Sequence, residues 1–334
     1  MSLPLHAQLI QMSTAGWITN ILYAAAELGL ADHLETPKTA TEIASGLDAD
    51  PRSLHRLMRT LASLGILSQG PDDRFSLTPL GASLKSDAPG SARSTLRTFG
   101  GPAFTRGFEN IVYSVKTGKT GFEKAHGKAI FDYLADHPAE ASMFSETMVG
   151  FHGGEPVAVA AAYDFSVFDT IVDVGGATGN MLAAILTRHT KPRGVLFDRS
   201  QVVGEAPVLL ESSCVMERVE IEGGDFFESV PSGGDAYILS HVLHDWSEAQ
   251  CLTILRNVRR AMKPNGRLLV VETVLPPGDT PHPGKILDIV MLVIPGGQER
   301  TEAEYAPLLA KAGFRLHRVV PTDSPVSIVD ASPA

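Results

Sequence analysis

The sequence predicts an α/β protein whose carboxyl-terminal half forms a mostly parallel sheet. Three observations lead to this fold class. From about residue 168, short runs of β-branched residues alternate with helical stretches, as in strand–helix–strand units. Residues 171–179 form an apolar strand that ends in a glycine-rich turn before a helix. The first 95 residues, by contrast, are helical in pattern and contain one short hairpin.

The amino-terminal region has the element order of a winged helix. Residues 8–30 carry apolar side chains at helical spacing. A threonine precedes the short helix within 39–44, and a proline opens the helix over 52–64, which a glycine ends. The segment 66–77 places two short strands around the turn Gly-Pro-Asp-Asp, which predicts a hairpin. This order predicts a winged-helix domain over residues 1–95.

Winged helices often bind DNA, so the charge of this region matters. Residues 1–95 hold seven basic and nine acidic side chains, a net charge of −2. A module that binds phosphates should be clearly basic. The helix over 52–64 does contain Arg52, Arg56 and Arg59. We interpret them as part of a solvated face or a dimer contact.

The composition excludes several protein classes. The chain has 334 residues, of which 44% are hydrophobic and 20% charged, and its formal net charge is −10. These values are typical of a globular protein of about two domains, and they disfavour general nucleic-acid binding. The sequence contains no stretch of about 18 uncharged apolar residues, so no membrane span is predicted. Because the amino terminus lacks a leader pattern and the two cysteines are not paired in a motif, we expect a cytoplasmic protein without a disulfide framework or a cysteine zinc site.

Residues 96–160 are rich in aromatic side chains and are expected to be helical. Most of these side chains should belong to the core, and some can line a pocket for a flat ligand. The sequence thus predicts three parts, which are a winged-helix domain over 1–95, a helical connector over 96–160 that contributes to the substrate pocket, and a catalytic domain over 161–334.

Seven segments after residue 168 have the composition of strands. Helices are expected between the early ones, so these strands should run parallel. The last two are joined only by residues 321–325, whereas a parallel crossover needs a dozen or more residues, so they should be antiparallel. The predicted strands are 170–174, 194–198, 219–222, 236–240, 268–272, 315–320 and 326–330.

The glycine-rich turn after the first of these strands marks a ligand site. Such a turn lets a ligand approach the main chain at the carboxyl end of the strand. A dinucleotide fingerprint starting at Gly175 needs two further glycines where this chain has Ala177 and Asn180, so that motif is absent. A phosphate loop is absent too, because Gly179 is followed by Asn180 instead of lysine.

Acidic residues lie at the ends of three successive predicted strands. Asp173 lies just before the glycine turn, where a carboxylate suits a cationic group better than a pyrophosphate. Asp198 ends the next strand, where a carboxylate binds ribose hydroxyls in nucleotide-binding α/β folds. Asp225 and Phe226 follow the third strand and can accept from an adenine amine and pack on its ring. The set predicts a nucleoside with a positive charge and no phosphate, which is S-adenosylmethionine.

With these motifs the whole chain resembles the class I S-adenosylmethionine-dependent methyltransferases. More narrowly, it is similar to the caffeate- and isoflavone-type small-molecule O-methyltransferases of plants and their bacterial relatives that act on polyketides, phenazines and similar natural products. The motifs that carry the resemblance are Asp173-Val-Gly-Gly-Ala-Thr-Gly179, Gly224-Asp-Phe-Phe227, Leu243-His-Asp-Trp246, Glu272 before Leu275-Pro276, and Pro295-Gly-Gly-Gln-Glu-Arg-Thr301.

The resemblance implies a Rossmann-like, seven-stranded sheet with an antiparallel last strand and a winged-helix dimerisation domain, and hence a homodimer. It also implies S-adenosylmethionine as the cofactor. The residues that it places at the cofactor are Asp173, Gly175, Gly176, Gly179, Asp198, Asp225, Phe226 and Ser240. Those that it places in the substrate pocket are Met148, His152, Trp246, Asp288 and Met291.

His244 is the candidate base of the implied reaction. It follows the strand ending at Ser240 and comes just before a helix, and the end of a central strand is a preferred catalytic position in open α/β sheets. Methyl transfer to a phenol requires that its oxygen lose the proton. Complete transfer beforehand, from a phenol with a pKa of about 10 to a histidine with a pKa of about 6.5, would cost roughly 5 kcal/mol. A positioned histidine can instead take the proton as the new bond forms.

Two acids are candidates to orient this histidine. Glu272 ends the fifth strand and Glu299 lies in the Pro-Gly-Gly loop, and residues at the matching positions of the resembled family flank the catalytic histidine. A carboxylate orients an imidazole and stabilises its protonated form. His241 lies three residues before His244, but no third ligand at suitable spacing accompanies this pair, so we expect no metal. We interpret His241 as a core histidine or as one that supports the site.

The chain departs from the family pattern at three places. Ala177 replaces the third glycine of the loop and adds a methyl group near the cofactor. Ser240 stands where many plant members have a lysine, which removes one cofactor contact. The loop before Pro295 is one residue shorter than in plant members and has Ile294 where a polar side chain is common. Plant substrates are therefore not expected.

The sequence predicts an S-adenosylmethionine-dependent O-methyltransferase that methylates a hydroxyl of an aromatic or conjugated secondary metabolite, with His244 as base and without metal. One alternative is the same fold performing C-methylation or another reaction on a natural product. The other is a ligand-sensing regulator that binds DNA, which the acidic winged helix disfavours. The joint presence of His244, Glu272 and Glu299 disfavours a scaffold that binds the cofactor without methylating.

Overall fold

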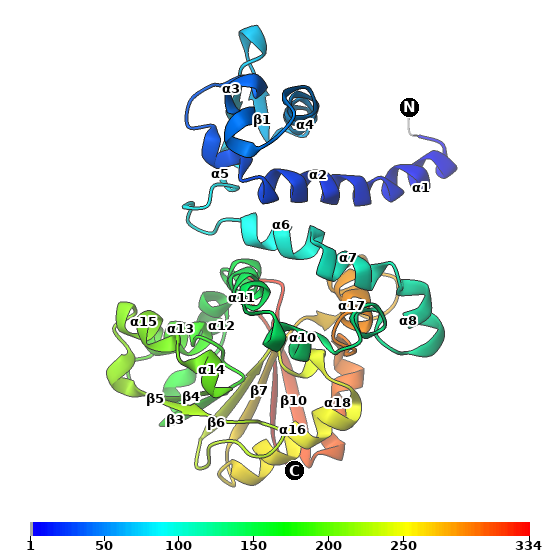
Figure 1. The fold of residues 1–334 in the computed structure, drawn as a ribbon. Helices are drawn as coiled ribbons and strands as arrows, with labels where there is room; N and C mark the ends of the chain where they lie inside the picture. Colours follow the sequence, from blue (N-terminus) through cyan, green and yellow to red (C-terminus); the bar gives the residue numbers. More distant parts are fainter. Residues whose placement is uncertain (1–2) are drawn as a thin grey trace. The chain divides into compact units, whose positions relative to one another are not determined.

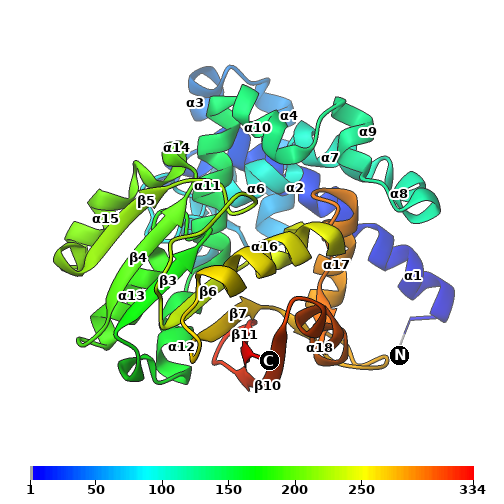
Figure 2. The ribbon, with the colours of Figure 1, turned by 90° about the horizontal axis from the view of Figure 1, so that it is seen from below.

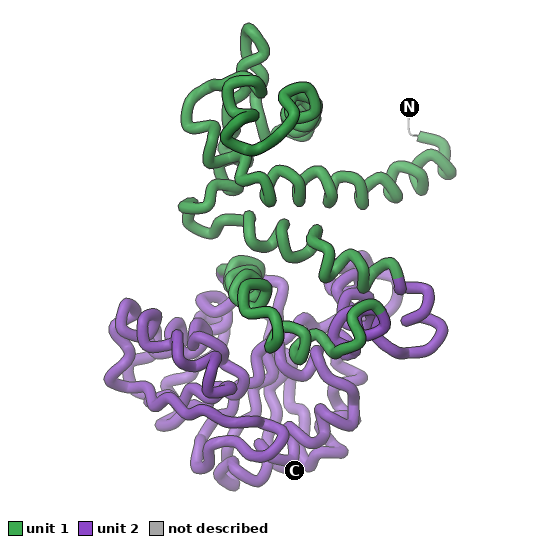
Figure 3. Tube along the Cα trace, in the orientation of Figure 1, with its two compact units in different colours: residues 1–109, 125–153 green, residues 110–124, 154–334 purple. Residues whose placement is uncertain are grey.

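The computed structural model describes residues 3–334, which form two compact units (Figure 3). The residues predicted as a connector, 96–160, contribute to both units, and the predicted domain boundaries stay predictions. Unit 1 comprises the described residues up to 109 together with 125–153, and unit 2 comprises 110–124 and 154–334.

The first part of unit 1 has the predicted order of helices and hairpin. Helix α3 begins with a capping box in which Thr39 and Glu42 each accept a hydrogen bond from the other's backbone N–H. Helix α4 starts at Pro51, and the Asp50 carboxylate accepts from the Ser53 N–H at 2.8 Å. Strands β1 and β2 pair antiparallel. The elements are α1 (Leu5–Ser13), α2 (Ala15–Glu27), α3 (Ala40–Ala44), α4 (Pro51–Ser63), β1 (Leu67–Gln69), β2 (Phe75–Leu77) and α5 (Pro79–Ala82), with 3-10 turns at Leu30–His33, Ser45–Leu47 and Pro71–Asp73.

The remainder of unit 1 is helical. A buried hydrogen bond of 2.8 Å between the hydroxyls of Thr98 and Thr147 joins α6 to α11. Phe99 packs edge-on against Phe151, so part of the aromatic content of this segment belongs to helix packing, as expected. The helices are α6 (Arg93–Gly100), α7 (Pro102–Phe108), α10 (Ile130–Asp136) and α11 (Pro138–His152), while α9 (Gly121–His126) crosses the division between the units.

A seven-stranded sheet forms the centre of unit 2 (Figures 1 and 2). The strand order is β10-β11-β7-β6-β3-β4-β5. Neighbours from β7 to β5 are parallel, whereas β11 is antiparallel to both β7 and β10. The predicted strands and the antiparallel last strand are confirmed. The strands are β3 (Thr170–Val174), β4 (Arg193–Asp198), β5 (Val219–Gly223), β6 (Ala236–Ser240), β7 (Arg267–Glu272), β10 (Phe314–Pro321) and β11 (Ser327–Pro333), and a separate pair consists of β8 (Val274–Leu275) and β9 (Arg300–Thr301).

Helices cover both faces of this sheet. Helices α12 to α15 contribute buried side chains to one hydrophobic cluster, and α16 and α18 contribute to the cluster on the opposite face. Among residues 3–334, no helix combines the length and apolar composition that a membrane span requires. The helices are α8 (Ile111–Thr117), α12 (Glu155–Ala162), α13 (Asn180–Arg188), α14 (Ser200–Val203), α15 (Ala206–Ser212), α16 (Glu248–Ala261), α17 (Gly284–Val293) and α18 (Glu302–Lys311), with 3-10 turns at Phe165–Val167, Met216–Arg218 and Leu243–Asp245.

The strand order reverses at β3, which locates the candidate site. Strands β4 and β5 follow on one side of β3, and β6 and β7 lie on the other. In open α/β sheets, ligands bind beyond the carboxyl ends of the strands at such a reversal. The loops after β3 and β6 carry the glycine-rich turn and His244.

Candidate active site

The glycine-rich loop between β3 and α13 brings its main chain close to a buried acid. Gly175 and Gly179 have φ angles of +74° and +87°, which glycine adopts without strain. A Cβ on Gly176 would lie 2.7 Å from the Asp173 Cγ, so only glycine lets the loop pass over this carboxylate. The loop thus packs closely against Asp173, and its predicted role in binding a ligand stays a prediction.

The Asp173 carboxylate is fully buried, and neither of its oxygens has a hydrogen-bond partner. Burial, and secondarily the negative charge of Asp198, raise its pKa to about 7. A buried acid without donors is costly unless a ligand supplies them. This carboxylate therefore fits the positively charged amino group of S-adenosylmethionine.

Asp198 and Asp225 already accept hydrogen bonds from nearby main chain. Asp198 ends β4 and accepts from the N–H of Ala177 at 2.9 Å and of Arg199 at 2.7 Å. Burial raises the pKa of Asp198 despite these bonds. Asp225 accepts from the N–H of Phe227 at 2.8 Å. Both acids shape the loops at this sheet edge, and their contacts with ribose and adenine stay predictions.

Trp246 packs against two phenylalanines that follow β5, and its predicted role in the substrate pocket stays a prediction. Its ring contacts Phe227 edge-on, with centroids 4.8 Å apart, and Phe226 at 6.1 Å. The Asn257 side chain on α16 donates to the Phe226 carbonyl at 2.8 Å and so fixes this loop. The three rings form an aromatic cluster beside Asp225.

The turn after β6 holds His244 by its main chain. The His244 N–H donates to Glu272 Oε1 at 3.0 Å, and its carbonyl accepts from the Gln298 N–H at 2.9 Å. The loop before β9 approaches so closely that a Cβ on Gly297 would lie 1.9 Å from the His244 carbonyl oxygen. His241, in the same turn, has φ +53°, a strained value for a non-glycine residue. The position of His244 is therefore determined before any ligand binds.

The His244 ring forms a buried dyad with Glu299. Its Nδ1 lies 2.7 Å from Glu299 Oε1, and Asp245 Oδ1 lies 3.7 Å from its Nε2. Burial alone would lower the pKa of His244. The charge of Asp245, the hydrogen bond to Glu299 and the charge of Glu272 outweigh burial and raise the pKa to about 10. The ring is a much stronger base than an ordinary histidine.

The two predicted orienting acids have different contacts. Glu299 bonds the imidazole ring, whereas Glu272 bonds the main chain of His244 and the hydroxyl of Tyr305. Burial raises the pKa of Glu272, and the positive charge of His244 opposes that rise. Their catalytic roles stay predictions.

The predicted substrate residues divide between the units. Asp288 and Met291 lie one turn apart on α17, and Asp288 Oδ1 accepts from the Glu299 N–H at 2.9 Å. Met291 is buried, and its carbonyl accepts from Gly296. Met148 and His152 are half-buried on α11 of unit 1. Ser240 ends β6, next to Val271 of β7.

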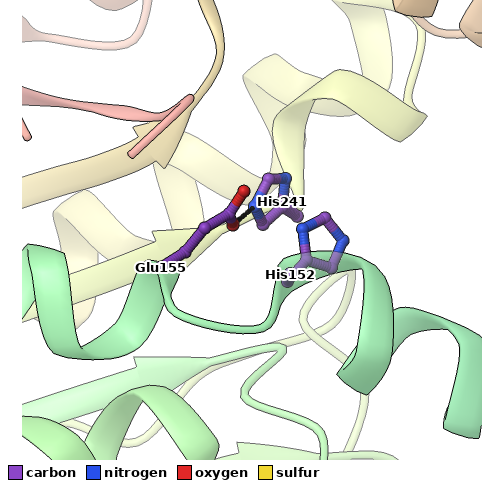
Figure 4. A group of neighbouring side chains, drawn as sticks. All are labelled: His152, Glu155 and His241. Carbon is purple, nitrogen blue, oxygen red and sulfur yellow. Dashed lines mark hydrogen bonds and ion pairs between the residues drawn. The ribbon is translucent and has the colours of Figure 1, made fainter. Parts of the chain in front are cut away.

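His241 forms a second histidine–carboxylate pair. Figure 4 shows its ring turned toward Glu155, and its Nε2 lies 2.7 Å from Glu155 Oε2. The ring centroids of His241 and His244 are 5.2 Å apart. The pair links the start of α12 to the end of β6, which agrees with the interpretation of His241 as a supporting histidine.

Sequence reasoning missed two buried residues of this network. Arg300 donates to the Leu243 carbonyl at 3.2 Å and approaches Cys251 Sγ at 3.6 Å. Tyr305 donates to Glu272. Arg300 belongs to the motif Pro295-Gly-Gly-Gln-Glu-Arg-Thr301, but the sequence predicts no function for it. Tyr305 has the helical spacing of a core residue next to Leu308 and Leu309. No sequence signal separates Tyr305 from an ordinary core aromatic.

Two family models match the chain. The O-methyltransferase dimerisation domain matches residues 10–87, and the O-methyltransferase domain matches residues 108–315.

Similar proteins include methyltransferases of hydroxyls and of nitrogens. A phenazine O-methyltransferase of Lysobacter antibioticus is 44% identical over 333 residues, covering 99% of this chain and 97% of the relative. An O-demethylpuromycin-O-methyltransferase of Streptomyces alboniger is 40% identical, covering 95% and 87%. A phenazine-1-carboxylate N-methyltransferase of Pseudomonas aeruginosa is 34% identical, covering 93% and 92%.

Solved structures share the complete fold. The crystal structure of LaPhzM superimposes with a TM-score of 0.95 at 44% identity, covering 99% of this chain and all of the other. An O-methyltransferase from neocarzinostatin biosynthesis, in complex with S-adenosylmethionine and 2-hydroxy-5-methyl naphthoic acid, has a TM-score of 0.84 at 31% identity, covering 95% and 96%. The Rossmann-like methyltransferase fold expected from the sequence is confirmed.

Proposed function

The chain belongs to the O-methyltransferase family, and from that premise we propose that it methylates a hydroxyl of an aromatic or conjugated small molecule of secondary metabolism. S-adenosylmethionine is the methyl donor of this class of enzyme. The observation that carries the proposal is the buried dyad of His244 and Glu299, with its 2.7 Å hydrogen bond, at the carboxyl end of β6. It supplies a base where an acceptor hydroxyl needs one.

Residues along the β3 edge are proposed to hold the cofactor. Asp173 would pair with its amino group, since this buried carboxylate has no partner within the described chain. Asp198 would accept from the ribose, and Asp225 with Phe226 would contact the adenine. Gly175, Gly176, Gly179 and Ser240 complete the proposed set. When bound, the cofactor supplies a methyl group on a positively charged sulfur.

His244 is proposed to remove the proton that the acceptor hydroxyl loses. As the oxygen forms its bond to the methyl carbon, the O–H electrons remain on oxygen and the proton passes to the His244 ring. Glu299 accepts the hydrogen bond from Nδ1 and stabilises the resulting imidazolium. The proton is then released to solvent before the next turnover.

The environment of His244 brings its pKa close to that of a phenol. The cost of roughly 5 kcal/mol given above rests on the difference between the pKa of a phenol and that of an ordinary histidine. With a pKa of about 10 for His244, this difference in pKa largely disappears. The same shift keeps the ring protonated at neutral pH in the absence of ligand. Because the neutral ring is the active base, we expect kcat/KM to rise with pH across the range from 7 to 9.

Relatives that methylate nitrogen give a second candidate function. The N-methyltransferase of Pseudomonas aeruginosa covers nearly the whole chain. An aromatic ring nitrogen presents a lone pair and has no proton to lose, so it requires no base. The buried and prepared dyad of His244 therefore favours a hydroxyl acceptor.

Labelled methyl transfer to a panel of phenols, hydroxylated heteroaromatics and aromatic N-heterocycles tests the proposal. We expect ether products, turnover that EDTA does not change, and a loss of about 10²–10⁴-fold in His244→Ala. His189→Ala is the matched control, since the Nε2 of its ring bonds the Ala160 carbonyl and no carboxylate. Full activity in His244→Ala, or label only on nitrogen, would overturn the proposal.

The winged-helix part is proposed to form a homodimer, as its match to the dimerisation domain supports. Helices α1 and α2 expose the large apolar side chains Leu5, Leu9, Ile10, Met12 and Trp17. Light scattering after size exclusion should give twice the mass of the chain. A cytoplasmic location and the absence of nucleic-acid partners also remain part of the proposal, and lack of retardation of duplex DNA at low salt would support the latter.

A further inference from the structure

Tyr305 is a fully buried tyrosine whose hydroxyl reaches the acidic network of the site. Helix α18 begins with a capping box between Thr301 and Glu304, directly after Glu299 and Arg300. This start directs Tyr305 inward, where its hydroxyl donates to Glu272 Oε2. Burial, together with the negative charge of Glu272, raises the pKa of Tyr305 well above its usual value, so it remains a neutral donor.

Glu272 depends on two donors. One carboxylate oxygen accepts from the His244 N–H and the other from Tyr305. The side chain has no exposed surface, so no bulk water replaces a missing donor. Burial raises the pKa of Glu272, and the hydrogen bond from Tyr305 is one of the interactions that lower it again.

The charges around His244 couple this carboxylate to the ring. Asp245, Glu272 and Glu299 are the acids that raise the pKa of His244. Arg300 provides a buried positive charge that favours the ionised form of Glu272. The second histidine of the turn, His241, faces the ring at 5.2 Å. Discharging Glu272 removes one of three negative charges that favour the imidazolium.

We propose that Tyr305 is a positioning residue that keeps Glu272 ionised, and that it thereby sets both the main-chain position and the base strength of His244. The proposal rests on His244 being the base of the proposed function. The hydroxyl of Tyr305 bonds Glu272, which in turn bonds the main chain of His244, so Tyr305 acts on the histidine through this carboxylate.

Removing the hydroxyl has a consequence of definite sign. In Tyr305→Phe, Glu272 loses a donor, its pKa rises, and it takes up a proton nearer neutral pH. His244 then loses a stabilising negative charge, and its pKa falls. The acid limb of the pH–rate profile should move to lower pH by about one unit, since a nearby charge changes a pKa by about 1–3 units.

The direct measurement is an NMR titration of the His244 ring, assigned by its disappearance in His244→Ala. We expect the midpoint in Tyr305→Phe to lie about one pH unit below wild type. Glu272→Gln should shift it in the same direction. In the double variant, Tyr305→Phe should add nothing further, because Glu272 is the residue through which it acts. An equal shift in the Glu272→Gln background would contradict the proposal.

Tyr237→Phe is the matched control. Tyr237 is equally buried in the same cluster, and its hydroxyl donates to the Pro231 carbonyl at 2.6 Å, away from the dyad. Both variants should lose thermal stability, but only Tyr305→Phe should move the midpoint. A merely structural Tyr305 would give identical midpoints in both, which overturns the inference. Since the NMR midpoint needs no turnover, this outcome is distinct from full activity in His244→Ala, which would overturn the proposed function instead.

Discussion

Two loops at the same sheet edge of unit 2 are built in opposite ways. The loop after β3 surrounds Asp173, a buried carboxylate without a hydrogen-bond partner. The turn after β6 fixes His244 by its N–H, its carbonyl and its Nδ1. The first loop leaves both carboxylate oxygens of its acid without a donor, whereas the second holds its histidine by three hydrogen bonds and leaves only one oxygen of its dyad, Glu299 Oε2, without one.

The difference follows from what each loop has to do. A ligand that arrives with its own positive charge can satisfy Asp173, so an unmatched acid gives affinity at the expense of stability. A general base must be oriented before the reaction, because reorganisation during the reaction would add to the barrier. In the proposed function, Asp173 obtains its hydrogen-bond partners from the ligand, whereas His244 obtains its partners from the folded protein.

Glu299→Gln should have the largest effect on the turn after β6 that holds His244. The variant keeps the shape of the side chain but removes the charge that holds and stabilises the protonated ring. We expect kcat to fall by about 10²–10⁴-fold. The acid limb of the pH profile should move to lower pH, because the hydrogen bond and charge of Glu299 help to raise the pKa of His244. Glu302→Gln, an exposed acid of α18, is the control, and equal rates in both variants would show that the dyad is not used.

Gly297→Ala tests whether the main-chain contacts matter beyond the side chains. The added methyl group would lie 1.9 Å from the His244 carbonyl oxygen, so the loop must move. A misplacement of about 1 Å can cost on the order of 10²-fold in rate. Steady-state kinetics should show this loss in kcat, while calorimetry should show unchanged cofactor affinity. Gly154→Ala is the control, because Gly154 has a φ of −84° and an added Cβ would meet open space, so kcat and cofactor affinity should not change.

In the loop after β3, Asp173→Asn should lower the affinity for the cofactor and raise the folding stability of the cofactor-free protein. Removing the charge is expected to weaken cofactor binding by about 2–5 kcal/mol, or at least 30-fold in Kd. The same change should stabilise the cofactor-free protein, because the pKa of Asp173 is about 7 when folded and 3.8 is its ordinary value. Between these values the native state retains a proton that the unfolded state has lost, so wild-type stability falls as pH rises from about 4 to 7.

Denaturant titrations at pH 4.5 and pH 8 measure this effect. The stability gain in Asp173→Asn should be on the order of 2–4 kcal/mol at pH 8 and fall to about 1 kcal/mol at pH 4.5. Asp235→Asn should instead lose stability, and by nearly the same amount at both pH values, since hydrogen bonds from Lys263 and from the Thr170 N–H lower the pKa of Asp235 below 3.8 despite its partial burial and keep it ionised at pH 4.5. A destabilised Asp173→Asn at pH 8 would mean that the carboxylate is satisfied within the fold.

The cofactor loop was predictable because its information is local in the sequence. The apolar strand, Asp173, the glycines and the following helix lie within some twenty consecutive residues, and the structure places strand β3 at the predicted residues. The short 321–325 connection likewise predicted that the last two strands are antiparallel, which the structure confirms. Local pattern is enough where neighbours in sequence are neighbours in space.

The catalytic turn was only partly predictable because its contacts are distant in sequence. His244 meets Glu272 and Glu299 across 28 and 55 residues, and Tyr305 meets Glu272 across 33. Family resemblance supplied the two acids, but their division between ring and main chain depends on packing. The ring contacts of Trp246 with Phe226 and Phe227 likewise come from packing, and its place in the substrate pocket stays a prediction. Apolar spacing does not reveal which buried side chain ends in a functional hydroxyl.

Ala177→Gly has the smallest expected effect, and it tests whether the glycine-rich loop after β3 contains backbone strain. Ala177 has φ +50°, where an alanine costs roughly 1–2 kcal/mol relative to ordinary backbone, while its N–H still donates to Asp198. Glycine relieves that strain but adds about 0.4–1 kcal/mol of unfolded-state entropy. The net gain in unfolding free energy should therefore lie between about 0 and 1.6 kcal/mol. Ala184→Gly, in the middle of α13, should lose about 1 kcal/mol under the same denaturation assay. Equal losses in both variants would show that the loop is unstrained, and that its readiness for a ligand resides in Asp173 alone.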